Sequence, residues 1–209
     1  MTDEPPKLAY RIHTERLCVR CYEPADAPML KASVDESIEH LRPWLPWAAD
    51  EPQSLEQKVQ LLRGFRGRFD LDQDHVYGAF DPAGERLLGG TGLHPRMGPE
   101  AREIGYWLNQ NATGRGLCTE MVAALTRVGF EVMQLDRIEI HCDVANARSS
   151  AVPERLGYRL EATLGRRVPG QGGEPRDAQI WTLFAHEYPE SPSAGTRCEA
   201  RDALGRVLL

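Results

Sequence analysis

Hydrophobic and polar positions change period in the middle of the chain, and this change predicts a strand, a turn and a helix in succession. Residues 103–108 form a short apolar segment with the composition of a β-strand. The apolar residues of 121–130 instead recur at the spacing of an α-helix. Gly114 and Gly116 lie between the two segments, and such a turn directs backbone N–H groups and a helix dipole to one place. The pattern therefore predicts a binding site for a phosphate group.

Two familiar phosphate motifs do not fit this turn. A P-loop ends in a lysine followed by serine or threonine, and no lysine stands at the end of this loop. The dinucleotide fingerprint needs a third glycine at the position of Thr119. The missing glycine therefore counts against a dinucleotide-binding oxidoreductase.

A second strand and a short helix follow this unit. Residues 137–143 alternate apolar and polar side chains, as a half-buried strand does. Asn146 stands three residues before Ser149 and can open a short helix as its N-cap. Gly157 can end that helix in the left-handed conformation.

Further segments complete the pattern of one α/β domain. Residues 14–20, 87–94 and 176–183 resemble strands of a known enzyme family, and residues 23–27 resemble the start of its first helix. Residues 41–47 form a loop rich in proline and tryptophan. No internal linker divides the 209 residues, which suit one domain with a full core.

Strand, glycine-rich turn, helix, strand and Asn-capped helix in this order resemble the GNAT superfamily of acyl-CoA-dependent N-acyltransferases. The RimJ/RimL type, whose members acetylate protein N-termini and related amines, is the closer match, and the resemblance extends from about Tyr10 to Glu187. It implies a single-domain α+β fold, of the broad α/β class, over residues 1–188. Its central sheet would be mixed and mostly antiparallel, with two splayed parallel strands and flanking helices. Residues 189–209 are expected to form a loosely held extension.

Composition and charge indicate the cellular location and exclude some classes of partner. The polar residues 1–7 do not form a signal peptide, and no stretch is long and apolar enough to span a bilayer. The five cysteines lack paired metal spacing, and Cys18 and Cys21 should face opposite sides of a strand. We therefore expect free thiols, no metal and a cytoplasmic location. The net charge of −6 argues against a nucleic-acid surface, so neither nucleic acid nor a membrane is an expected partner.

The resemblance assigns a set of residues to acetyl-CoA. Backbone N–H groups around the turn would hold the pyrophosphate, and Asn111 stands where the family has glutamine or arginine. A backbone N–H near Leu108 or Asn109 would hold the thioester carbonyl oxygen. Asn146 would bind the pantetheine arm, besides or instead of capping its helix. The expected cofactor-binding residues are Leu108, Asn109, Asn111, Thr113, Gly114, Arg115, Gly116, Leu117, Cys118, Thr119 and Asn146.

For the general base we expect Glu103, because RimL-like enzymes carry a candidate glutamate at this place. The other interpretation of Glu103 is an exposed carboxylate at a strand end. His94, His141 and Asp143 are alternative bases on neighbouring strands.

For the general acid, many GNAT enzymes use a tyrosine at the place where Pro153 stands here. Ser149 therefore becomes the expected partner of the departing thiolate. Because a serine hydroxyl is a weak acid, it would hydrogen-bond the sulfur while water delivers the proton. A covalent acyl-enzyme through Cys118 is rejected, since that residue lies in the expected phosphate turn.

The acceptor is the least determined part. Trp44 and Trp47 could line its pocket or simply pack, and Asp50 and Glu51 could attract an amine. The expected acceptor is a protein N-terminus or a small amine, and the donor is acetyl-CoA or, in some relatives, succinyl-CoA.

Because many relatives pair through their last strands, a homodimer is a reasonable expectation. The alternative function is a non-catalytic acyl-CoA sensor that kept the fold.

Overall fold

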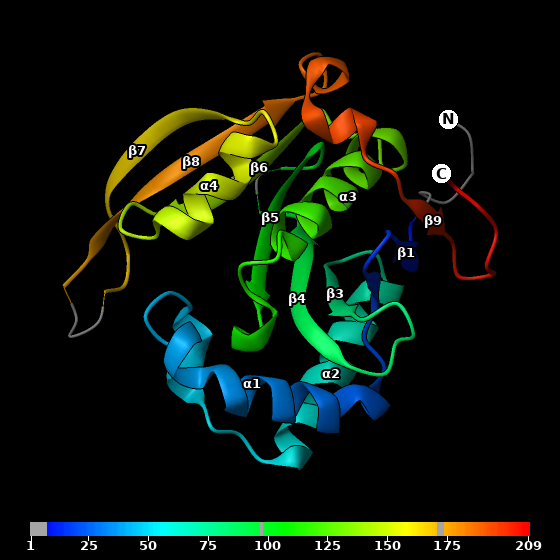
Figure 1. The fold of residues 1–209 in the computed structure, drawn as a ribbon, viewed down its shortest axis with the longest axis vertical. Helices are drawn as coiled ribbons and strands as arrows, with labels where there is room; N and C mark the ends of the chain where they lie inside the picture. The colour runs from blue at the N-terminus through cyan, green and yellow to red at the C-terminus, as the bar shows by residue number, and fades with distance from the viewer. Residues whose placement is uncertain (1–7, 97, 171–173) are drawn as a thin grey trace.

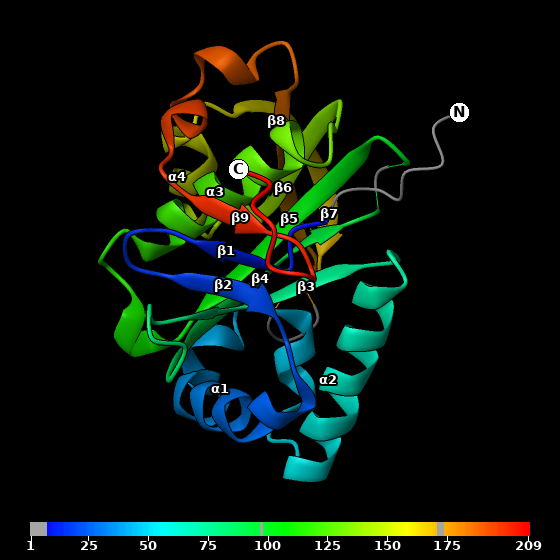
Figure 2. The same cartoon turned by 90° about the vertical axis from the view of Figure 1, so that its right-hand side faces the viewer.

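A nine-stranded sheet organises the computed structural model, which describes residues 8–96, 98–170 and 174–209 (Figure 1). The strands are β1 (Arg11–His13), β2 (Cys18–Cys21), β3 (His75–Phe80), β4 (Leu87–His94), β5 (Ala101–Leu108), β6 (Arg137–Asp143), β7 (Arg159–Val168), β8 (Arg176–Phe184) and β9 (Glu199–Arg201). The helices are α1 (Ala27–Leu41), α2 (Leu55–Asp70), α3 (Leu117–Glu131) and α4 (Ala147–Arg155). The strand order is β7-β8-β6-β5-β4-β3-β2-β1-β9. Helices α1 and α2 cover one face of the sheet, and α3 and α4 cover the other (Figures 1 and 2).

Strands β5 and β6 form the parallel pair of this otherwise antiparallel sheet, and they stay together over only three residues. Ala101–Glu103 face Arg137–Glu139. Beyond these residues β5 continues to Leu108 and β6 to Asp143 without pairing to each other. The expected mixed sheet with splayed parallel strands is therefore confirmed.

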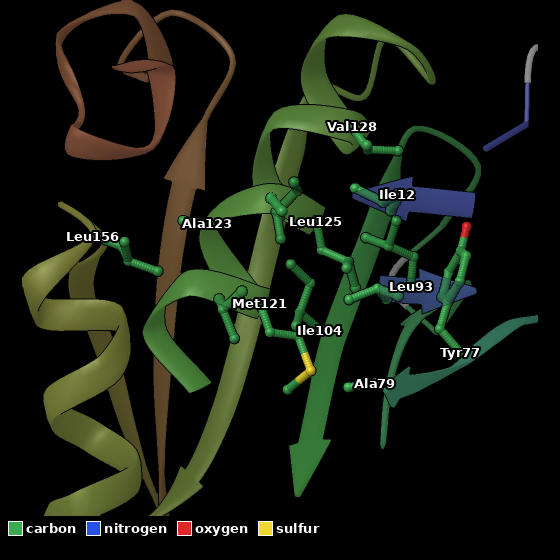
Figure 3. Close-up of a cluster of buried hydrophobic side chains, with 14 of the residues drawn as sticks. Ile12, Tyr77, Ala79, Leu93, Ile104, Met121, Ala123, Leu125, Val128 and Leu156 are labelled. Carbon is green, nitrogen blue, oxygen red and sulfur yellow. The ribbon is translucent and has the colours of Figure 1, made fainter. Parts of the chain in front are cut away.

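Alternate residues of β5 face the two helical layers, as the period of a strand requires. Ile104 and Leu108 lie in the main core beneath α3, where Figure 3 shows Ile104 and Met121. Trp107 packs on the opposite side, against the smaller core beneath α1 and α2. Glu103 lies on the same side as Trp107, because the two residues are four positions apart in the strand.

Glycines occupy four positions on the α1–α2 side of three neighbouring strands, namely Gly78, Gly90, Gly92 and Gly105. Neighbouring side chains lie directly over them. A Cβ atom at Gly90 would lie 2.5 Å from Trp107 Nε1, and one at Gly92 would lie 2.6 Å from His94 Nε2. This glycine floor leaves room for a cleft between the sheet and α1 and α2.

Residues 199–201 belong to the sheet, so the expectation of a loosely held extension is wrong for them. Strand β9 pairs antiparallel with β1, and Ala200 is fully buried (Figure 2). Directly before the extension, Tyr188 stacks on Phe130 of α3 with ring centres 4.8 Å apart. Backbone pairing and apolar burial hold this segment, although its sequence is rich in serine and glycine.

Cys18 and Cys21 confirm the alternation expected for their strand. Both are buried in β2, Cys18 in the core beneath α1 and α2 and Cys21 in the core beneath α3. The five cysteines are free thiols. No helix among the described residues is long and apolar enough to cross a membrane.

Candidate active site

A cleft of about 2200 Å³ passes through the splay between β5 and β6. At one end it reaches the glycine-rich turn before α3, and at the other it opens over the glycine floor beneath α1 and α2. Most of the residues expected at the site line it, namely Trp44, Trp47, Glu103, Leu108, Thr113, Gly114, Gly116, Leu117, Cys118, Thr119, Asn146 and Ser149. Asn109, Asn111 and Arg115 do not line it.

The glycine-rich turn has the geometry that a phosphate group needs. Gly114 and Gly116 both have φ of +75°, a left-handed conformation that glycine adopts without strain. Gly116 is the N-cap of α3. Within the described part of the chain, no group accepts a hydrogen bond from the backbone N–H groups of 114–119. These donors and the positive end of the helix dipole fit the pyrophosphate of a CoA thioester.

Arg16 is a functional candidate that the sequence pattern did not reveal. Its Nη1 donates to the carbonyl oxygen of Arg115 at 2.7 Å, and its Nε donates to Glu120 of α3 at 2.6 Å. Thr14 also donates to Glu120, at 2.6 Å. The segment between β1 and β2 therefore supports the phosphate turn and places a guanidinium group at its edge. No spacing in the sequence links residues about 100 positions apart.

The free backbone donor in the splay belongs to Leu108 and not to Asn109. The Asn109 N–H donates to the carbonyl oxygen of Leu88 in β4, at 2.8 Å. Because successive N–H groups of a strand point to opposite sides, the Leu108 N–H points toward the splay. Of the two positions expected to hold the thioester oxygen, only Leu108 can do so.

The side chains of Asn109 and Asn111 hold the loop instead of contacting the cleft. Asn109 is buried, and its amide donates to Ser33 Oγ at 3.1 Å and to Glu36 at 2.6 Å. Asn111 donates to the other oxygen of Glu36 at 2.5 Å. Both asparagines thus fasten the end of β5 to α1. Asn109 was expected to act through its backbone N–H, which bonds Leu88 instead, and the side chain of Asn111 bonds Glu36 in this structure.

Ser149 lies in a chain of hydroxyl and thiol groups at the base of the splay. Its Oγ is 3.1 Å from Tyr106 Oη and 3.4 Å from Cys142 Sγ. Tyr106 Oη donates to the Ser149 carbonyl oxygen at 3.0 Å. That oxygen is available because Pro153, four residues on, has no N–H to bond it. Burial raises the pKa of Tyr106 well above its usual value, so its hydroxyl remains protonated.

Tyr106 was not among the expected site residues, although the sequence held a signal for it. It stands two positions before Leu108 and therefore faces the same side of β5. What the sequence could not supply is the contact between that hydroxyl and α4.

Cys118 and Cys142 are both protonated thiols. Burial raises the pKa of Cys118 to about 12, and it also raises that of Cys142. A thiol in this state is a poor nucleophile. The structure therefore agrees with the rejection of an acyl-enzyme through Cys118.

Asn146 caps α4, as its alternative interpretation required. Its side-chain oxygen accepts from the Ser149 N–H at 3.1 Å. Because Asn146 also lines the cleft, its capping role leaves room for a contact with a ligand there.

Glu103 lies in a polar cluster at the far end of the splay. It is 9% exposed, and Arg96 Nη1 donates to one of its oxygens at 3.0 Å. His141 Nδ1 is 3.9 Å from the other oxygen, while His141 Nε2 is 2.8 Å from Glu139. Burial raises the pKa of Glu139, but hydrogen bonds from Arg137 and His141 outweigh it and hold that pKa below its usual value. A nearly buried Glu103 contradicts the exposed strand-end interpretation.

His94 forms a second acid–base pair above the glycine floor. Its Nδ1 is 2.8 Å from Asp74 Oδ1, and its Nε2 lies over Gly92 and Gly105. With the proton on Nδ1, Nε2 is an acceptor that faces the cleft. Asp74 precedes β3 and was not visible as a site residue, because it stands 20 positions from His94.

The two tryptophans expected at the acceptor side line the open end of the cleft. Trp47 meets Trp107 edge-on with ring centres 6.0 Å apart. Trp44 lies 5.3 Å from the guanidinium of Arg176 in β8, which forms an ion pair with Asp143 at 2.7 Å. The loop after α1 is thereby tied across the cleft to the end of β6.

A phosphate-binding turn beside two splayed strands defines the class of acyl-CoA-dependent acyltransferases. The family model of the acetyltransferase (GNAT) domain matches residues 16–159. The chain therefore belongs to the GNAT acetyltransferases. It is an N-acetyltransferase, and acetyl-CoA is the acyl donor of its family.

Its relatives include proteins named for ribosomal substrates. It is 28% identical over 177 residues to the putative ribosomal N-acetyltransferase YdaF of Bacillus subtilis, covering 83% of this chain and 94% of YdaF. It is 30% identical over 159 residues to the [ribosomal protein uS5]-alanine N-acetyltransferase of Escherichia coli, covering 75% of this chain and 80% of the relative.

Among solved structures, the ribosomal L7/L12 α-N-protein acetyltransferase RimL, in complex with coenzyme A, has the same fold. The TM-score is 0.75 at 22% identity, over 82% of this chain and 95% of RimL.

Proposed function

We propose that the protein transfers the acetyl group of acetyl-CoA directly to a primary amine, and that the amine is the N-terminus of a protein. One observation carries the proposal. A single cleft joins a phosphate-binding turn to an open, glycine-floored face through the gap between β5 and β6. A donor can therefore enter from the α3 side while an amine approaches its carbonyl from the α1–α2 side. The relatives named for ribosomal proteins support a protein N-terminus.

Each role falls to a residue of this chain. Backbone N–H groups of 114–119 hold the pyrophosphate, and the Leu108 N–H holds the thioester oxygen, where negative charge develops. Glu103 accepts the proton of the amine, directly or through a water molecule. Ser149, held by Tyr106, donates a hydrogen bond to the departing sulfur. Bound acetyl-CoA supplies the activated acetyl group.

The cellular location and the oligomeric state of the enzyme are part of the same proposal. A ribosomal-protein acceptor supports a cytoplasmic location. A homodimer is proposed from resemblance to the family, and light scattering on the purified chain measures it directly.

The test is release of CoA thiol from acetyl-CoA, with succinyl-CoA beside it, against peptides and small amines. Turnover with peptides and little with small amines supports the proposal. Turnover only with small amines would show that the acceptor is a small amine and not a protein N-terminus. Tight CoA binding without turnover on any acceptor would favour the sensor function.

A further inference from the structure

Two hydrogen-bond donors in the acceptor half of the cleft have no partner within the described part of the chain. They are the hydroxyl of Tyr22, which follows β2, and the indole Nε1 of Trp107 in β5. Tyr22 is only 2% exposed, yet it lines the cleft. Neither atom is fully buried, so both donors face the space of the cleft, where a ligand can reach them.

Both donors converge on one place. A Cβ atom at Gly90 would lie 2.5 Å from Trp107 Nε1 and 3.0 Å from Tyr22 Oη. Gly78, which pairs with Gly90 across β3 and β4, makes room for the ring of Tyr22, since a Cβ there would lie 2.7 Å from that ring. The glycine floor thus allows two polar side chains to meet above the sheet.

The walls around this place are apolar. Leu30 and Val34 of α1 and Phe65 of α2 line the cleft there and belong to the same core as Tyr22. The centre of the Phe65 ring lies 6.2 Å from that of Tyr22. A small group with one polar atom therefore suits the place better than a charged or extended group does.

The two donors also indicate what that polar atom is. Indole Nε1–H only donates, whereas a phenol hydroxyl donates or accepts. Burial raises the pKa of Tyr22 above its usual value, so the phenol keeps its proton. A hydroxyl oxygen has two lone pairs, so it can accept from both Trp107 Nε1–H and the Tyr22 hydroxyl, and both donors are then satisfied.

The two donors lie close to the proposed site of acetyl transfer, because Trp107 directly precedes Leu108 in β5. The Leu108 N–H faces the splay, and neighbouring strands are about 4.8 Å apart. The amine nitrogen and the β-hydroxyl oxygen of an N-terminal serine are about 3–4 Å apart, and a hydrogen bond adds about 3 Å, so a hydroxyl bound here keeps its amine near the splay.

We propose that Tyr22 and Trp107 form a subsite for the side-chain hydroxyl of the acceptor's first residue, so that the enzyme prefers N-terminal serine to alanine. The inference rests on the proposed function, because it names the acceptor of that same site. A site built to hydrogen-bond a hydroxyl rejects the analogue that lacks it, since its donors are then left unpaired.

The experiment compares kcat/KM of the full-length enzyme for two peptides that differ only in serine or alanine at position one. We expect a serine preference of at least about tenfold. Tyr22→Phe keeps the ring and removes the hydroxyl, and it should reduce the ratio to within about threefold. Tyr10→Phe is the matched control, because Tyr10 bonds Asp70 away from the cleft and its loss should leave the ratio unchanged.

Equal rates for the two peptides in the wild type would overturn the inference, because a main-chain carbonyl that every peptide carries would then occupy the donors. A ratio unchanged in Tyr22→Phe would overturn it as well. Trp107→Phe repeats the test if Tyr22→Phe does not fold.

Absence of turnover with any amine would instead refute the proposed function. Calorimetry of the two peptides on the CoA-loaded protein then decides the inference. Tighter binding of the serine peptide supports the subsite, and equal affinities overturn it.

Discussion

The hydroxyl groups of Ser149 and Tyr106 show how much one residue depends on its neighbours here. A serine hydroxyl is too weak an acid to protonate a thiolate unaided. Tyr106, kept protonated by burial, fixes the position of Ser149 by bonding its carbonyl oxygen. In the proposed mechanism the pair stabilises the departing sulfur by hydrogen bonding, and water delivers the proton.

Ser149→Ala should lower kcat by about tenfold and leave the Kd for CoA within about twofold, because only a hydrogen bond to the leaving group is lost. Steady-state kinetics and calorimetry with CoA measure the two quantities. Ser150→Ala is the matched control, since Ser150 bonds Gln179 and does not line the cleft. A full loss of turnover in Ser149→Ala would make the hydroxyl an obligatory proton donor.

Glu103 and His94 are both candidates for the general base that accepts the proton of the amine, and substitution of each residue distinguishes them. Glu103→Gln should reduce kcat/KM by about a hundredfold, within the usual range for loss of a general base. His94→Gln should reduce it less than tenfold, because it removes an imidazole that we place beside the amine's path. Circular dichroism checks that both variants fold. The reverse order of effects would assign the base to His94 and Asp74.

The raised pKa of the buried Cys118 thiol predicts how its alkylation depends on pH. Because burial raises the pKa of Cys118 to about 12, roughly one molecule in ten thousand carries its thiolate at pH 8. A raised pKa means that the thiolate fraction grows about tenfold for each pH unit up to that value. Alkylation of Cys118 by iodoacetamide, followed by mass spectrometry, should be slow at pH 8 in the native protein and fast in urea. Rapid native alkylation would reopen the covalent route.

At the scale of elements, the sequence predicted the strands and helices around the site well. The strand at 137–143 and the helix opened by Asn146 occur as expected, because alternation and capping are local properties. It also predicted the turn at Gly114 and Gly116, since only glycine adopts a φ of +75° without strain. The contacts of the asparagines beside that turn could not be predicted, because their partner, Glu36, lies in a distant helix.

Gly116→Ala tests the turn as an element. The substitution forces a Cβ into a left-handed N-cap, which should cost about 1–2 kcal/mol of stability and raise the KM for acetyl-CoA. Gly67→Ala is the matched control, since Gly67 lies within α2 and its Cβ would meet no atom within 4 Å. It should instead stabilise the protein by up to about 1 kcal/mol. Chemical denaturation measures both, and equal stabilities would contradict the proposed strain.

At the scale of the whole molecule, the closing of the sheet by β9 is the feature that the sequence concealed. Its three residues pair with β1, which is equally short, and bury Ala200 completely. Such short pairings carry no periodic signal, since three residues fit any pattern. Their stability comes from strands that the rest of the fold has already placed.

Ala200→Asp should destabilise the protein by about 3 kcal/mol, because it buries a charge without a partner. Leu204→Asp is the matched control, since Leu204 is 78% exposed and should tolerate the change within about 0.5 kcal/mol. Thermal unfolding of the two variants measures the difference. Equal melting temperatures would mean that the extension is loosely held after all.

The sequence by itself determined the order of elements, the glycine-rich turn and the family, because these depend on residues close together along the chain. The tertiary structure alone decided which groups meet in the cleft. Arg16 reaches the phosphate turn, Asp74 reaches His94, and Tyr22 meets Trp107 above Gly90. Each of these contacts joins segments that are distant in sequence and adjacent in the sheet or its covering layers. Local patterns fix how a segment folds, whereas packing fixes which side chains share a site.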